Sequence, residues 1–175
     1  MELPNLLDDL EREAHAKAAS VISSMTDAGF SLATCESLTA GLAASTLASV
    51  PGASKVLRGG FVTYATELKY ALVGVTEGLD PITEQCAKEM ASGARARTES
   101  DFALSFTGVA GPDLQDGHPV GEIWLGCAGP SGVEAINVTF DRYDGSTPAD
   151  FGRQGLRLLS CIQGYDLLLA RISGI

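Results

Sequence analysis

The sequence predicts an α/β/α sandwich, a single α/β domain in which a mixed β-sheet lies between layers of helices. Segments with helical spacing of apolar residues alternate along the chain with short runs of β-forming residues. Aromatic residues make up only 6% of the chain and glycine occurs 20 times, which favours close backbone packing. A chain of 175 residues suffices for one domain with a sizeable core, so we expect a single domain over residues 1–175.

Helix signals are clearest at the two ends of the chain. Near the start, apolar residues recur every three or four positions, and Gly29 stands where a C-terminal cap would. Thr83 and Thr147 are suitable N-caps, and Pro148 suits a first helical position, although three glycines argue against an unbroken last helix. A short helix or tight loop should follow residue 64. The main helices expected run over residues 5–28, 42–50, 83–98 and 148–170.

The strands are expected between these helices, where apolar and β-branched residues form short runs bounded by turn residues. Gly129-Pro130-Ser131-Gly132 should join the last two strands as a hairpin. Residues 53–58 read as a connector. The strands expected run over residues 30–33, 59–64, 102–106, 120–127 and 133–140.

Charge and cysteine content exclude several classes of protein. The formal net charge is −10 with only 12 Lys and Arg residues, so we expect no nucleic-acid partner. Four widely spaced cysteines form no C-x-x-C pair and suit buried free thiols in a reducing cytosol better than disulfides or a zinc site. An acidic N-terminal segment and the lack of an apolar run of ~20 residues predict a soluble, cytoplasmic protein with no membrane partner.

Three polar segments follow predicted strands, and in open α/β sheets ligands bind beyond strand ends. They are Glu36-Ser37-Leu38-Thr39, Tyr64 to Lys69, and Thr107 to Pro112. The first lies at a helix start, where unpaired N–H groups would favour an anion or a developing oxyanion. Ser37 or Thr39 could equally be a simple N-cap. Three such segments in one small domain suggest a shared pocket.

A serine nucleophile at this turn would need a base. His15 reads as a helix-surface residue, and His118 lies in a polar loop without the G-x-S-x-G pattern of a hydrolase triad. Lys69 is the other candidate, since desolvation can make lysine a base, although the residues alone favour a solvated helix lysine. No cluster of residues resembles a metal site.

The three polar segments together resemble the CinA C-terminal domain family, which includes stand-alone nicotinamide-nucleotide amidases of the PncC type. The likeness runs in order from about Leu10 to Asp141. Its motifs here are Thr34-Cys35-Glu36-Ser37-Leu38-Thr39-Ala40-Gly41-Leu42-Ala43, Gly59 to Lys69 followed by Leu72-Val73-Gly74-Val75, and Thr107-Gly108-Val109-Ala110-Gly111-Pro112 followed by Pro119-Val120-Gly121. The large N-terminal domain of full-length CinA proteins has no counterpart, so the short amidase form is expected.

The resemblance assigns roles to individual residues. Ser37 matches the nucleophile and Lys69 its base, while Tyr64 and Thr107 match hydroxyls that line the catalytic pocket. The residues expected to bind substrate are Glu36, Thr39, Gly41, Gly108, Gly111 and, for the phosphate, Arg142. The sequence departs from the family pattern at Ala40, where Gly is frequent, at Thr66, where Asn is usual, and over residues 143–146.

The function implied by the resemblance is hydrolysis of the carboxamide of nicotinamide mononucleotide (NMN) to nicotinate mononucleotide and ammonia, a step of pyridine nucleotide salvage. N–H groups at the start of the helix from Leu42 are expected to hold the oxyanion. No cofactor or metal is implied, and family members are often dimers, so we expect a homo-oligomer. The alternatives are a nucleotide-binding regulatory domain without turnover, and a hydrolase of another amide or ester with His118 as its base.

Overall fold

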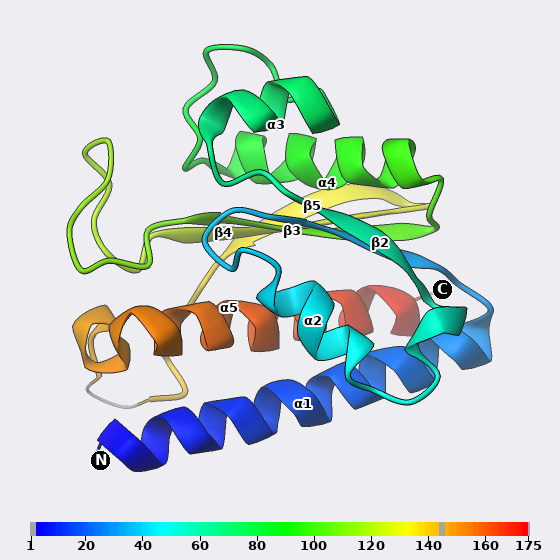
Figure 1. The fold of residues 1–175 in the computed structure, drawn as a ribbon, viewed down its shortest axis with the longest axis horizontal. Helices are drawn as coiled ribbons and strands as arrows, with labels where there is room; N and C mark the ends of the chain where they lie inside the picture. Colours follow the sequence, from blue (N-terminus) through cyan, green and yellow to red (C-terminus); the bar gives the residue numbers. More distant parts are fainter. Residues whose placement is uncertain (1–2, 144–145, 175) are drawn as a thin grey trace.

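In the computed structural model, which describes residues 3–143 and 146–174, five strands form one mixed sheet in the order β2-β1-β3-β4-β5 (Figure 1). β1 is parallel to β2 and β3, whereas β4 is antiparallel to both β3 and β5. The carboxyl ends of the first three strands therefore meet at one edge of the sheet. The strands are β1 (Leu32–Glu36), β2 (Leu57–Val62), β3 (Phe102–Gly108), β4 (Ile123–Gly129) and β5 (Gly132–Asn137).

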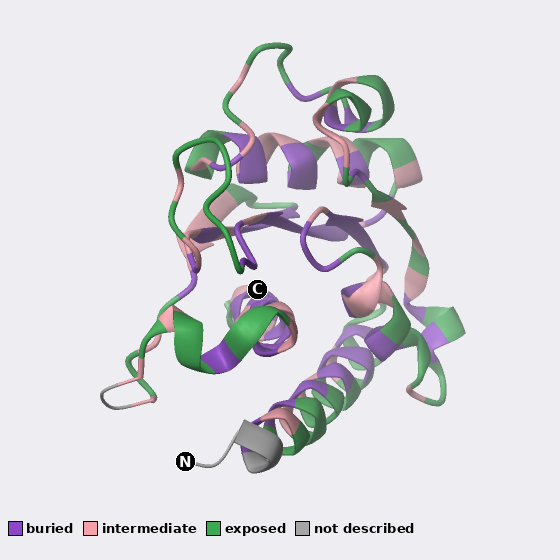
Figure 2. Ribbon diagram, turned by 60° about the vertical axis from the view of Figure 1, so that its left-hand side comes forward, coloured by how far each residue is buried: buried purple, intermediate pink, exposed green. Residues whose placement is uncertain are grey.

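Helices cover both faces of the sheet. α4 lies on one face with α3 outside it, and α2 and α5 lie on the other face (Figure 1). α1 packs against α5 and α2, so that its apolar stripe is buried and its opposite side is exposed (Figure 2). The predicted α/β/α sandwich with a mixed sheet is confirmed. The helices are α1 (Leu3–Ala28), α2 (Leu42–Ala48), α3 (Thr66–Val73), α4 (Glu84–Thr98) and α5 (Pro148–Ser173), with a 3-10 turn at Ala53–Lys55.

The predicted helix signals are confirmed at the helix ends. The Thr83 side chain accepts a hydrogen bond from the N–H of Cys86, and Gly29 follows α1 with a positive φ of 71°. At the start of α5, Thr147 and Asp150 form a reciprocal capping box ahead of the remaining turns. These local interactions explain why the helix starts were readable from the sequence.

The glycines of α5 have structural reasons that the sequence did not reveal. Gly152 breaks the helical geometry with φ 60° and ψ 177°, so α5 is kinked one turn after it begins. At Gly164 a β-carbon would lie 2.6 Å from the ring of Phe106, so only glycine lets α5 approach the sheet this closely. Close packing therefore requires glycine at position 164, whereas the positive φ of the kink favours glycine at position 152.

Several strand boundaries differ from the sequence prediction. β4, expected from residue 120, begins at Ile123, and β5, expected to reach residue 140, ends at Asn137. β1 begins at Leu32 and continues through Glu36, because parallel pairing to both neighbours extends it into the polar segment. The expected connector over 53–58 instead holds the 3-10 turn and the start of β2, which pairs Leu57 with Leu32. Of the unusual segment over residues 143–146, positions 144 and 145 lie outside the described residues.

All four cysteines are buried and unpaired. Burial raises the pKa of Cys35 to about 12 and that of Cys86 to about 11, so both are neutral thiols near neutral pH. Within the described ranges 3–143 and 146–174, no helix combines the length and apolarity needed to cross a membrane.

Candidate active site

The ends of β1, β2 and β3 surround a small cavity of about 100 Å³, as the strand-end segments predicted. Its wall includes Ser37 from the turn after β1, Tyr64 from the turn after β2, and residues 108–111 that follow β3. α5 completes the wall with Arg153, and the exposed loop between β3 and β4 contributes Asp113. In Figure 1 this β3–β4 loop extends beyond the sheet on the same side as the first turns of α5.

Ser37 and Lys69 are brought together at this cavity. Lys69, on α3, is only 2% exposed, and its Nζ donates to Ser37 Oγ at 3.2 Å and to the carbonyl of Thr63 at 2.9 Å. Ser37 itself is half-buried and is held by its N–H, which donates to the Phe106 carbonyl at 2.9 Å. A hydroxyl and an amine within hydrogen-bond distance are the arrangement that a serine–lysine nucleophile requires.

The surroundings of Lys69 favour its neutral form. Desolvation lowers the pKa of Lys69 from its ordinary value. The electrostatic effects of nearby Cys86, Cys35 and Glu67 raise this pKa, but by less than burial lowers it. Among the described residues no carboxylate lies within ion-pair distance of Nζ. A lowered pKa increases the fraction of neutral Lys69 at a given pH, and the neutral amine can accept a proton from the serine hydroxyl.

Glu36 is turned away from the cavity and towards its own chain. Its carboxylate is 1% exposed and accepts hydrogen bonds from the N–H groups of Gly41, Ala43 and Ala44 at 2.8–3.1 Å, and from the Thr34 hydroxyl at 3.1 Å. The N–H groups at the start of α2, which were expected to hold an oxyanion, are therefore already occupied. Glu36 stabilises this turn instead of contacting a ligand directly.

Three other predicted site residues also have structural roles. Gly41 adopts φ 92° as it leads into α2, a backbone geometry that favours glycine. Thr107 is 1% exposed and its hydroxyl donates to the Pro81 carbonyl at 2.5 Å, so it does not line the cavity. The Thr39 side chain is fully buried, and its hydroxyl has no hydrogen-bond partner among the described residues.

Gly108 and Gly111 lie in the cavity wall, where the sequence placed them. At Gly108 a β-carbon would stand 2.4 Å from the Glu122 carbonyl oxygen, and φ is +148°, so a side chain there would displace the backbone. At Gly111 φ is +79° and a β-carbon would meet the Val120 side chain at 2.9 Å. These glycines keep the cavity open and allow its wall to pack against the next strand.

The structure does not bring Arg142 to the cavity. The Arg142 guanidinium is 60% exposed and forms an ion pair with Glu13 of α1 at 2.9 Å. The cation at the cavity is Arg153, which donates to the Tyr64 hydroxyl at 2.7 Å and to the Gly111 carbonyl at 2.5 Å. Sequence reasoning missed Arg153, and the available signal was its spacing of one helical turn from a second arginine, Arg157.

Neither histidine is placed as a partner of Ser37. His15 is exposed on α1, where its Nδ1 lies 3.2 Å from the hydroxyl of Ser49. His118 uses both ring nitrogens elsewhere, at 3.0 Å from carboxylate oxygens of Glu122 and Asp80. These hydrogen bonds, to Glu122 first and then to Asp80, raise the pKa of His118. Through this second contact His118 links the β3–β4 loop to Asp80, which precedes α4.

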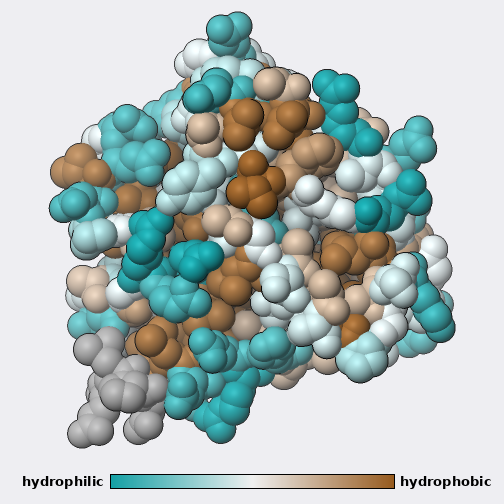
Figure 3. All heavy atoms as spheres, in the orientation of Figure 1, coloured by the Kyte–Doolittle hydropathy of each residue, from teal (hydrophilic) through white to brown (hydrophobic). Residues whose placement is uncertain are grey.

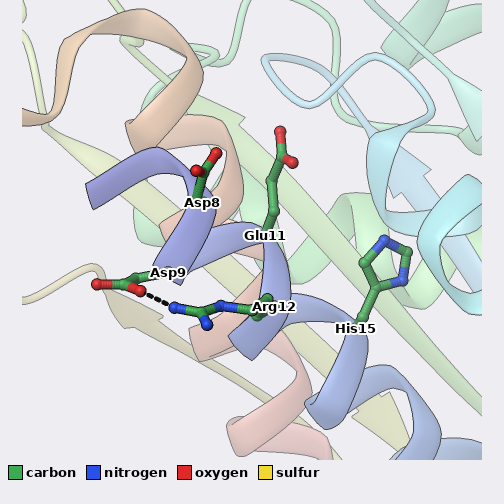
Figure 4. A pocket seen from close by; sticks show the side chains of 5 residues that line it. All are labelled: Asp8, Asp9, Glu11, Arg12 and His15. Carbon is green, nitrogen blue, oxygen red and sulfur yellow. Dashed lines mark hydrogen bonds and ion pairs between the residues drawn. The ribbon is translucent and has the colours of Figure 1, made fainter. Parts of the chain in front are cut away.

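A larger surface hollow, of about 890 Å³, lies over the start of α1 (Figure 4). Its five side chains come from about two turns of the same helix, and Asp9 is already paired with Arg12. A single exposed helix face offers no opposed groups that could orient a substrate.

Exposed apolar side chains gather at the end of β2 and on α3, near Tyr64, where brown patches appear in Figure 3.

Comparison with known proteins identifies a family and individual relatives that this chain resembles. The model of the CinA C-terminal domain matches residues 14–162. The chain is 44% identical over 146 residues to a putative competence-damage inducible protein of Levilactobacillus brevis, and 42% identical over 130 residues to one of Streptococcus pneumoniae. These alignments cover 73% and 72% of the chain but 35% and 31% of the relatives, so the chain spans about a third of their length.

Solved structures share the fold. The competence/damage inducible protein CihA from Agrobacterium tumefaciens is 32% identical, with a TM-score of 0.80 over 90% of this chain and 94% of that one. The competence damage-inducible protein A from Klebsiella pneumoniae is 23% identical, with a TM-score of 0.82 over 91% of this chain and 97% of that one. The second likeness supports the architecture alone.

Proposed function

The chain belongs to the CinA C-terminal domain family, and we propose that it is an amidohydrolase with Ser37 as nucleophile and Lys69 as general base. The observation that carries the proposal is the buried Lys69 amine 3.2 Å from the Ser37 hydroxyl at a cavity wall. As substrate we propose the carboxamide of NMN, in keeping with the family resemblance of the strand-end motifs.

The proposed reaction has two halves. Neutral Lys69 takes the Ser37 proton while Oγ forms a bond to the amide carbon; the C–N bond then breaks, and Lys69 gives the proton to the departing nitrogen, which leaves as ammonia. In the second half, water attacks the acyl ester, Lys69 takes a proton from it, and the ester bond to Oγ breaks. The proton returns to Oγ, and the acid product ionises to a carboxylate.

The cavity supports a division of the substrate into two parts. About 100 Å³ is too small for a whole nucleotide, so the carboxamide end would enter beside Ser37. The sugar phosphate would stay at the mouth, where Arg153 is exposed and already donates to Tyr64 and Gly111. A guanidinium at the mouth is suited to a phosphate because it offers planar paired donors.

Ammonia release from NMN tests the proposal directly. Wild-type protein should release ammonia, and Ser37→Ala and Lys69→Met should not. Matched controls are Ser45→Ala, an exposed serine of α2, and Lys88→Met, a lysine on the outer side of α4; both should keep wild-type turnover.

The test also separates the enzyme from a regulatory domain. Calorimetry that detects NMN binding by folded wild-type protein without ammonia release would contradict the amidohydrolase and support a binding domain. Turnover retained by Ser37→Ala would contradict the assignment of the nucleophile.

A further inference from the structure

The amide reaction places a negative charge on the substrate oxygen, and the turn after β1 offers two peptide groups to meet it. We call residues 37–41 the serine loop. The N–H of Ser37 donates to Phe106, that of Ala40 to the Ser37 carbonyl, and that of Gly41 to Glu36. Among the described residues, the N–H groups of Leu38 and Thr39 have no acceptor. These two directly follow the nucleophile, a place where hydrolases take an oxyanion donor.

The carbonyls of the same two residues are held from α5. Arg157 donates through Nε to the Leu38 carbonyl at 3.0 Å and through Nη2 to the Thr39 carbonyl at 2.7 Å. Its third donor, Nη1, bonds to the Gln154 side chain at 2.6 Å. Because the guanidinium is planar and bonded on three nitrogens, it fixes both carbonyls in one orientation.

Orientation of a carbonyl also orients the next N–H. A trans peptide is planar, and its C=O and N–H point in opposite directions. When Arg157 draws the Leu38 carbonyl towards α5, the N–H of Thr39 points away from α5. The Ser37 carbonyl is likewise taken by Ala40, which sets the direction of the Leu38 N–H.

Resting on the proposed function, we infer that the N–H groups of Leu38 and Thr39 form the oxyanion site and that Arg157, through the Leu38 carbonyl, positions the Thr39 N–H within it. As Oγ bonds to the carbon, the C=O π electrons move onto the oxygen. The two N–H groups then donate hydrogen bonds to this negatively charged oxygen. The electrons return to the C=O bond as the C–N bond breaks. Arg157 touches no reacting atom and acts through the serine loop.

Variants of Arg157 test this role. Arg157→Leu removes both carbonyl bonds and should lower kcat about 10- to 100-fold, because a displaced oxyanion donor loses much of its effect. KM should change by less than about threefold, because Arg157 does not itself line the cavity and meets its wall only at the Leu38 backbone. Arg157→Lys can keep one carbonyl bond but not both, so its kcat should fall between those of wild type and Arg157→Leu. This second variant also serves if Arg157→Leu fails to fold.

Arg171→Leu is the matched control. Arg171 is another α5 arginine that donates to a backbone carbonyl, that of Gly132, and it also pairs with Glu134. It lies near the other end of α5 and makes no contact with the serine loop. Thermal unfolding should shift to a similar extent in both leucine variants, whereas kcat should fall only in the Arg157 variant. The pH at half-maximal kcat should be unchanged, since Lys69 is untouched.

A serine-directed fluorophosphonate provides a readout that does not depend on the substrate. Its reaction with Ser37 also builds negative charge on an oxygen, so Arg157→Leu should be labelled more slowly by a similar factor. Arg157→Leu with wild-type kcat and labelling rate, or with losses matched by Arg171→Leu, would overturn the inference. Wild-type protein that neither releases ammonia nor is labelled would overturn the proposed function itself.

Discussion

Two loops frame the cavity, and the protein holds them in different ways. The serine loop has Leu38 and Thr39 buried at its centre, and it is held by the Glu36 carboxylate at Gly41, its last residue, and by Arg157 from α5. The β3–β4 loop is exposed over residues 112–117 and is held by Arg153 at Gly111 and by His118 at its far end. The comparison teaches that groups assigned to the chemistry are fixed by charge-assisted bonds that are at least partly buried, whereas some of the bonds on the side facing the rest of the substrate are exposed to water.

The largest expected contrast is between variants at Lys69 and at Arg153. Lys69→Met should lower kcat about 10²–10⁴-fold, the typical effect of losing a general base. Arg153→Leu should instead raise KM for NMN, by about 10- to 100-fold for the loss of a charged hydrogen bond, with kcat changed much less. Steady-state kinetics of both variants checks this. A fall in kcat alone for Arg153→Leu would place that arginine with the chemistry and break the comparison.

Carboxylates of the two loops provide a matched pair for stability. Glu36→Gln should lower the free energy of unfolding by about 2 kcal/mol, because a buried charged acceptor of three N–H groups becomes a neutral amide. Glu122→Gln removes a half-exposed partner of His118 and should cost less than about 1 kcal/mol. Urea unfolding gives both values. Equal costs would show that the serine loop is no more firmly held than the other.

The pH dependence of kcat should follow the ionisation of Lys69 and should be independent of Arg153. Lys69 must be neutral to accept the serine proton, so kcat should rise with pH to a plateau. The midpoint of this rise should lie below 10.5, the ordinary lysine value, since burial lowers the pKa of Lys69. Arg153→Leu should keep this midpoint. A kcat profile that rises only above 10.5 would show that Lys69 stays charged in the enzyme–substrate complex below that pH.

The smallest expected effect concerns His118. Its pKa is raised by Glu122 and Asp80, so the stabilisation it provides is complete below the ordinary value of 6.5 and is lost as pH rises through the raised pKa. Hydrogen-exchange protection of residues 113–118 should therefore decrease over that pH range in wild type. In His118→Leu it should be low throughout, with KM altered by no more than about fivefold. Hydrogen-exchange protection that does not change with pH in wild type would contradict a stabilising role of charged His118 in the β3–β4 loop.

Much of this organisation could be predicted from local sequence. Caps such as Thr83 and Thr147 act within one helical turn, so their helices were placed correctly. Ser37 and Lys69 were singled out by the family resemblance, and the structure places them together. The predicted NMN substrate and the dimer stay predictions.

The missed parts depend on contacts between distant segments. Arg157 reaches carbonyls about 119 positions away, and no local pattern encodes that approach. Glu36 looked like a ligand contact because a carboxylate near a serine is ambiguous until the path of the chain is known. Arg142 was expected at the substrate phosphate from the family resemblance, but its actual neighbour is Glu13, far away in the sequence.

The order in which the chain is synthesised gives α5 one more consequence. Ser37 and Lys69 leave the ribosome long before Arg153 and Arg157, and α5 is the last of the described elements to be made. A nascent chain that has folded its parallel strands still lacks both arginine anchors of the cavity. If Arg153 and Arg157 act as proposed, full hydrolytic competence would be acquired only in a late step, when α5 docks.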